Sequence, residues 1–190
     1  PLVLVLAALL GLVVLLNGTA LAEQDLAPRG APQAALRTTP CVTMGSQATC
    51  ELWAVTGTLS LPDGATVPIW GYSASADAGS AQIPGPTLIV TEGVDVDVIL
   101  HNGLGDTTAM VFPGQAMMPD LEGVPPDGTT TYSFNASSPG PYLYEAGLLP
   151  NAQHQVAMGL YGGLVVRPEL GATYAYSDTT TMFDDETLLV

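Results

Sequence analysis

The sequence predicts an all-β sandwich, and three observations support this. Short apolar or β-branched stretches recur along the chain, separated by turn residues at intervals of about ten residues. The 21 glycines and 16 prolines mostly lie between these stretches. No long stretch has the periodicity of an amphipathic helix. Many short strands with frequent turns are typical of a sandwich or barrel.

The clearest single strand is predicted over Val94–Leu100. Alternate residues from Val94 to Leu100 are apolar, and the aspartates between them, Asp95 and Asp97, would lie on the opposite face. Strict alternation is typical of a strand with one buried side. A helix would bring Val94 and Asp97 to nearly the same face, which has no physical advantage.

The remaining strands are predicted from β-branched and aromatic content between turn signals. The first two are expected to form a hairpin across Pro62-Asp63-Gly64. A further strand is expected to begin at Asp184–Val190, as the start of a second domain beyond the first. The other predicted strands are Glu51–Leu61, Ala65–Tyr72, Thr87–Thr91, Thr107–Phe112, Thr129–Asn135, Pro141–Glu145 and Leu160–Arg167.

The N-terminus has the layout of a secretory signal. Leu2–Leu16 is almost entirely apolar, and Ala20-Leu21-Ala22 follows as a small-x-small cleavage site. We therefore interpret residues 1–22 as a signal cleaved after Ala22, with an uncleaved membrane anchor as the alternative. Residues 23–40 are predicted to be a flexible leader, and residues 41–183 a single domain. The chain is expected outside the cytoplasm: extracellular, periplasmic or at the cell surface.

The charge balance excludes some partners. The chain has 18 acidic residues, three basic residues and a net charge of −15. Nucleic acids and anionic membrane surfaces require positive charge, so neither is expected, and the membrane would be reached only through an uncleaved N-terminus. Because the acidic residues are scattered, solubility is the favoured explanation, with attraction of cations as the alternative.

Two cysteines flank a Gly-Ser turn signal. In an exported chain Cys41 and Cys50 are expected to form a disulfide that joins the two sides of the first hairpin. A metal site built on the two cysteines is the alternative, but no histidine lies near them in sequence.

Five phrases, in order, resemble the first plastocyanin-like (cupredoxin) domain of multicopper oxidases. The resemblance covers roughly Val55–Pro168 and implies a Greek-key β-sandwich of the cupredoxin type. A shared fold does not by itself define function, which depends on the site. The phrases are Pro84–Gly93, Val94–Leu104, Pro125–Phe134, Gly140–Tyr144 and Gly159–Val166.

The same resemblance implies a departure at the copper ligands. The family's domain supplies two His-x-His pairs to a three-copper cluster. The matching positions are Val111 and Pro113 in the first motif and Glu145 and Gly147 in the second. Imidazole nitrogen suits copper, whereas only Glu145 among these four side chains offers a donor atom. We therefore predict that this chain holds no cofactor of its own, with copper possible in later domains.

The remaining candidate ligands are the two histidines, several methionines and a few acidic residues. His101 is expected at the surface end of a strand, and His154 with Met158 is a weak candidate for copper, in a region that also contains Met110, Met117 and Met118. The alternative for His154 is a loop histidine packed under these methionines. Asp120, Glu122 and Asp127 lack the order of a calcium loop. Asn17 and Asn135 match the glycosylation sequon, and no catalytic set is apparent.

These observations favour a noncatalytic structural module of a larger protein, packed against a neighbouring cupredoxin domain. The turns at Phe112-Pro113 and Ala146-Gly147 are expected to form the apolar surface buried in that contact. Two alternatives remain: an active copper-dependent oxidoreductase whose copper sites lie in later domains, and an extracellular structural or adhesion domain.

Overall fold

The computed structural model describes residues 39–77 and 79–190. The predicted signal, the sequon at Asn17 and the leader up to residue 38 lie outside these residues. Within them, no helix is both long enough and apolar enough to cross a membrane.

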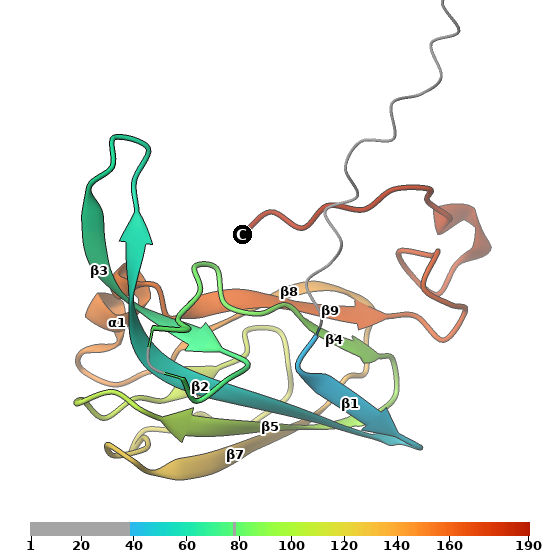
Figure 1. The fold of residues 1–190 in the computed structure, drawn as a ribbon. Coiled ribbons are helices and arrows are strands. Elements are labelled where there is room, and N and C mark those ends of the chain that lie inside the picture. Colours follow the sequence, from blue (N-terminus) through green and yellow to red (C-terminus); the bar gives the residue numbers. More distant parts are fainter. Residues whose placement is uncertain (1–38, 78) are drawn as a thin grey trace, which may run out of the picture. The chain divides into compact units, whose positions relative to one another are not determined.

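Two β-sheets face each other, as predicted (Figure 1). The first has the order β1-β2-β5-β7, with β3 also paired to β2, and the second has the order β4-β9-β8-β6. The chain passes repeatedly from one sheet to the other, as in a Greek-key sandwich. The first sheet contains β1 (Cys41–Met44), β2 (Gln47–Ser60), β3 (Thr66–Ser73), β5 (Asp95–Asn102) and β7 (Thr129–Asn135). The second contains β4 (Leu88–Thr91), β6 (Met110–Val111), β8 (Gly140–Ala146) and β9 (Tyr161–Arg167).

Strand β5 has the alternation that its sequence predicts. Val96, Val98 and Leu100 are fully buried, whereas Asp95 is exposed and Asp97 is half-buried. Strand β5 pairs in parallel with β2 and antiparallel with β7. The parallel pairing is a long-range feature that no local pattern indicates.

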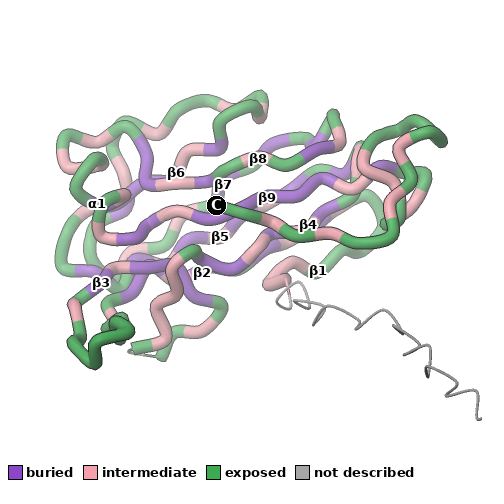
Figure 2. The backbone as a smooth tube through the Cα atoms, turned by 90° about the horizontal axis from the view of Figure 1, so that it is seen from above, coloured by how far each residue is buried: buried purple, intermediate pink, exposed green. Residues whose placement is uncertain are grey.

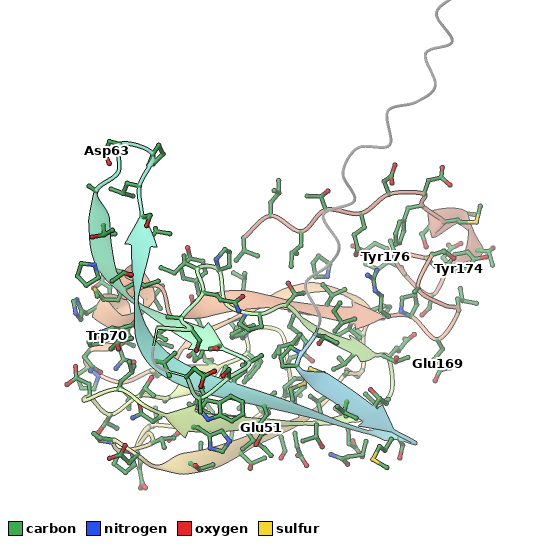
Figure 3. All side chains as sticks on the ribbon, in the orientation of Figure 1. Glu51, Asp63, Trp70, Glu169, Tyr174 and Tyr176 are labelled. Atoms are coloured by element: carbon green, nitrogen blue, oxygen red, sulfur yellow. A yellow bond between two sulfur atoms is a disulfide. The ribbon has the colours of Figure 1, made fainter. Side chains whose placement is uncertain are left out.

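Strand β2 is long enough to have different partners along its length. Its first residues pair with β1, and its second half pairs with β3 as the predicted hairpin. The tip of this hairpin, with Asp63 in its turn, projects beyond the sandwich (Figures 1 and 3). Leu59 and Leu61 near the tip are 40% and 37% exposed, so the tip adds little to the core.

The core lies between the two sheets. Figure 2 shows buried backbone along β2, β5, β8 and β9 and mainly exposed connections between strands. Aromatic rings fill the centre: Phe112 lies 5.1 Å from Phe134 and 6.1 Å from Tyr144 between ring centroids. Burial of these large apolar surfaces, at about 25 cal/mol per Å², is the main force that stabilises the sandwich.

Two predictions about secondary structure were wrong, and one element was missed. The strand expected over Thr107–Phe112 is confined to Met110–Val111, although Thr108 forms an isolated bridge to Val124. No strand forms over Asp184–Val190; instead Glu186 makes an ion pair with Arg167, and Leu188 lies against Gly163. A helix, α1 (Ala152–Met158), was not expected at all.

Helix α1 was missed because it is too short to show a period. It ends at Gly159, whose φ of 119° favours glycine, and a side chain there would collide with Ile83 and with the Trp70 carbonyl. Its buried Gln155 fixes it to the sandwich: Thr108 Oγ1 donates to Gln155 Oε1 at 2.9 Å, and Gln155 Nε2 donates to the Thr107 carbonyl at 2.9 Å.

Candidate functional site

The two turns that match the family's ligand motifs lie side by side. Strand β6 pairs antiparallel with β8, which places Val111 opposite Glu145 and Met110 opposite Ala146. The Gly147 N–H donates to the Ala109 carbonyl at 2.8 Å and extends this pairing by one residue. The fold therefore brings together the two turns that the resemblance matches to ligand motifs.

The side chains at these positions do not suit copper. Val111 is half-buried and Pro113 is exposed, and neither has a donor atom. The Glu145 side chain is half-buried and makes no hydrogen bond or ion pair with the described residues. One carboxylate without imidazole partners is a poor donor set for copper, so the residues present do not fit a copper cluster. Across residues 39–77 and 79–190, no group of three or more His, Cys, Asp or Glu could hold a metal ion.

The backbone at Gly147 also leaves little room for a larger side chain. A Cβ there would lie 3.2 Å from the Ala109 Cβ and 3.2 Å from the Met110 carbonyl atoms. Phe112 is only 1% exposed and Ala146 only 5%, because both belong to the domain's own core. The expectation that Phe112 and Ala146 form a surface for another domain was therefore wrong.

Apolar side chains are nevertheless exposed on the connections that follow the two turns. Met118 is 86% exposed, Leu121 69% and Leu148 58%. These two connections touch, since a side chain at Gly123 would collide with Leu149. Sequence patterns did not predict that these three side chains would be exposed near one another, because their exposure depends on the tertiary arrangement of the two loops.

Asp120 has a structural role beside the turns. Asp120 Oδ1 accepts the N–H groups of Glu122 and Gly123, and Asp120 Oδ2 accepts the Tyr132 hydroxyl at 2.8 Å. Partial burial raises the pKa of Asp120, but these hydrogen bonds together outweigh it and hold the pKa below its usual value. Asp120, Glu122 and Asp127 do not form a cation site.

His101 is held on the outer face of the first sheet. Its ring stacks on Trp53 at 4.6 Å between centroids, with an interplanar angle of 12°. Nδ1 lies 3.0 Å from Thr129 Oγ1, and Nε2 lies 3.1 Å from Glu51 Oε1. The ring belongs to β5, near the strand's end, and both of its nitrogens already have partners.

His154 lies on α1, so its interpretation as a loop histidine under methionines was wrong. It is exposed, and its ring meets Trp70 edge-on at 5.4 Å between centroids. The methionines differ in burial: Met110 is buried in the core, Met117 is half-buried and Met118 is exposed. Sequence reasoning missed the contact with Trp70, because β3 and α1 are far apart in the chain.

The predicted disulfide is confirmed. Cys41 and Cys50 are bonded, and the two residues lie directly opposite each other in the β1–β2 pairing. Cys50 is fully buried, so the bond joins the first strand to the core.

The facing sheets and the paired turns define a domain of the cupredoxin class. The chain belongs to the multicopper oxidase family, since the family model described as multicopper oxidase matches residues 62–171.

Curated relatives include the multicopper oxidase MmcO of Mycobacterium tuberculosis. It is 33% identical over 119 residues, which cover 59% of this chain and 23% of that protein. Copper resistance protein A of Pseudomonas syringae pv. tomato is 29% identical over 130 residues, covering 64% of this chain and 21% of that protein. The chain thus spans about a quarter or less of these two relatives.

Solved structures show the same fold. A multicopper oxidase from Pseudomonas thermotolerans aligns with a TM-score of 0.59 at 24% identity, covering 69% of this chain and 32% of that chain. The copper nitrite reductase from Nitrosomonas europaea aligns with a TM-score of 0.56 at 27% identity, covering 65% of this chain and 42% of that chain.

Proposed function

We propose that this chain is a noncatalytic cupredoxin domain of a larger, exported multicopper-oxidase-like protein. The proposal rests chiefly on the pairing of Val111 with Glu145. This pairing brings together the two turns that match the family's ligand motifs, yet neither position is a histidine. Without those nitrogens the domain has no means of holding its share of a copper cluster.

The packing around the turns supports a structural role. Phe112 contacts Tyr132, Phe134 and Tyr144, so this end of the sandwich is filled by rings of the domain's own core. Such a core requires no metal to hold the two sheets together. The domain would therefore contribute shape and contact area to its protein rather than electron transfer.

The partner that we propose is a second cupredoxin domain of the same protein. The exposed side chains of Met118, Leu121 and Leu148 would be covered by this contact. Relatives several times longer than the matched segment support the presence of further domains. Export is supported by the Cys41–Cys50 bond, because disulfides persist in oxidising compartments.

Oxygen uptake tests the noncatalytic role. The purified chain is loaded with copper, passed through a chelating column, and supplied with a reducing substrate. We expect oxygen uptake no faster than that of the buffer with the same residual copper. Uptake that survives the column and disappears in Glu145→Gln would overturn the proposal, because the turns would then support the chemistry.

Export is tested by finding which cell fraction contains the chain and where its mature N-terminus lies. After expression with the N-terminal segment in place, the cell fractions are separated and the mature N-terminus is determined by mass spectrometry. We expect a chain outside the cytoplasm that begins at Glu23. An intact N-terminus in the membrane fraction would favour the anchor, and a cytoplasmic chain with free thiols would contradict export.

A further inference from the structure

The two histidines differ in what their ring nitrogens contact. Both nitrogens of His101 are engaged, one with Thr129 and the other with Glu51. The His154 side chain is exposed on α1, and its ring makes no hydrogen bond or ion pair with the described residues. Its two nitrogens are therefore available to bind a ligand from solution, whereas those of His101 are not.

A sulfur donor lies one helical turn further along. Met158 follows His154 by four residues on α1, and residues at this spacing are neighbours on one side of a helix, about 5–6 Å apart at Cβ. Met158 is half-buried, so part of the residue remains accessible to solvent at this side of the helix.

Trp70 fixes the position of this pair. Figure 3 labels Trp70 on β3, and Figure 1 places α1 beside that strand. The rings of Trp70 and His154 meet at an angle of 83°. At the end of the helix Gly159 is pressed against the Trp70 carbonyl, since a Cβ there would lie 2.5 Å from that oxygen. Helix α1 therefore lies against β3 both at His154 and at Gly159.

We propose that His154 and Met158 form a surface site for a soft monovalent cation, Cu(I), beside the indole of Trp70. Imidazole nitrogen and thioether sulfur are the donors that such a cation prefers. A cation held within about 6 Å of the face of the indole would gain a cation–π attraction as well. The net charge of −15 raises the local concentration of cations around the whole chain, and the soft donors select among them.

This site is separate from the paired turns and goes beyond the proposed function. It binds an ion and involves no electron transfer or oxygen chemistry. The site could therefore exist in a domain that has no catalytic copper, and the two proposals can fail independently. Binding that depends on His154 tests this one, and oxygen uptake that depends on Glu145 tests the other.

The experiment uses Ag(I) as a redox-inert soft cation and Trp70 as the reporter. Trp53→Phe removes the other tryptophan, so the remaining emission comes from Trp70. We expect one equivalent of Ag(I) to change that emission to saturation. Cu(I), supplied anaerobically with a competing chelator, should give the same stoichiometry. His154→Ala and Met158→Leu should each weaken binding by at least about tenfold, since removing even an outer-shell partner of a metal ligand costs about 10–100-fold in affinity.

Matched controls separate a specific site from general attraction to an acidic protein. His101→Ala and Met118→Leu should bind as tightly as the parent, and Mg(II) should leave the Trp70 emission unchanged. Thermal melts should show that His154→Ala and Met158→Leu remain folded. Equal Ag(I) affinity in His154→Ala and the parent would overturn the proposal, and so would a response to Mg(II) of the same size as that to Ag(I).

Discussion

Tyr72 and Tyr144 lie 5.3 Å apart between ring centroids at the centre of the sandwich, and only one of their hydroxyl groups has a partner. Tyr144 donates to the Pro86 carbonyl at 2.6 Å. The Tyr72 hydroxyl is fully buried and has no hydrogen-bond partner among the described residues. Burial, with a smaller contribution from Tyr144, raises the pKa of Tyr72 far above its usual value.

Tyr72→Phe should raise the free energy of unfolding by about 1 kcal/mol. An unpaired buried hydroxyl costs about 1–3 kcal/mol, and phenylalanine removes that cost without changing the shape of the ring. Tyr144→Phe is the matched control: it should lower the free energy of unfolding by about 1 kcal/mol, because it leaves the Pro86 carbonyl unpaired. Urea unfolding measures both, and a loss of stability in Tyr72→Phe would show that its hydroxyl has a partner such as a buried water.

Gln155→Leu should lower the free energy of unfolding by about 2 kcal/mol. The substitution leaves the Thr107 carbonyl and the buried Thr108 hydroxyl without their partner on α1, at about 1–3 kcal/mol for each unpaired group. Gln153→Leu, at an exposed position of the same helix, should change stability by less than about 0.5 kcal/mol. Equal melting temperatures for the two variants would mean that α1 is not fixed through Gln155.

Loss of the disulfide should cost about 2 kcal/mol. The Cys41→Ala, Cys50→Ala variant opens a loop with a sequence separation of 9, which is short, so the entropic gain from closing it is modest. Treating the parent with a reductant should lower its melting temperature to that of the variant. Hydrogen exchange should show faster opening of β1 than of β5, because β1 pairs only with β2. Unchanged stability after complete reduction would contradict the prediction.

Asp120 should make stability depend on acid pH. Its pKa is lowered in the folded state, so its contribution is fully present above the unfolded value near 4 and is lost as the pH falls through the folded value. Asp120→Asn should therefore have a flatter stability profile below about pH 4 than the parent. Asp106→Asn is the control, since the exposed Asp106 carboxylate accepts no hydrogen bond from the described residues. Parallel acid profiles for the parent and Asp120→Asn would contradict this.

Histidine should destabilise the domain more at Gly147 than at Val111. Gly147→His should lower the free energy of unfolding by about 1–3 kcal/mol, because its Cβ would crowd Ala109 and the Met110 backbone. Val111→His, at a half-buried position directly opposite Glu145, should cost less than about 1 kcal/mol. Thermal and urea unfolding compare the two. A Gly147→His variant as stable as the parent would show that the turn can still admit a ligand.

Most of the strands could be predicted because local chemistry alone specifies them. Alternation fixes which residues of β5 are buried, and the bounds of β7 were predicted without error. The disulfide followed from two cysteines on either side of a turn. Helix α1 and the C-terminal segment were predicted wrongly, because tertiary contacts rather than periodicity hold them: Gln155 for the helix, and the Arg167–Glu186 ion pair for the segment.

Residue type and short-range spacing were enough to predict the β-sandwich class and to show that no histidine occupies the ligand positions of the paired turns. The burial of Phe112 in the core, the unpaired hydroxyl of Tyr72 and the contact between His154 and Trp70 could not be predicted in this way. These features join residues that are distant in the chain. Their energies depend on burial and on partners, which exist only once the two sheets have packed together.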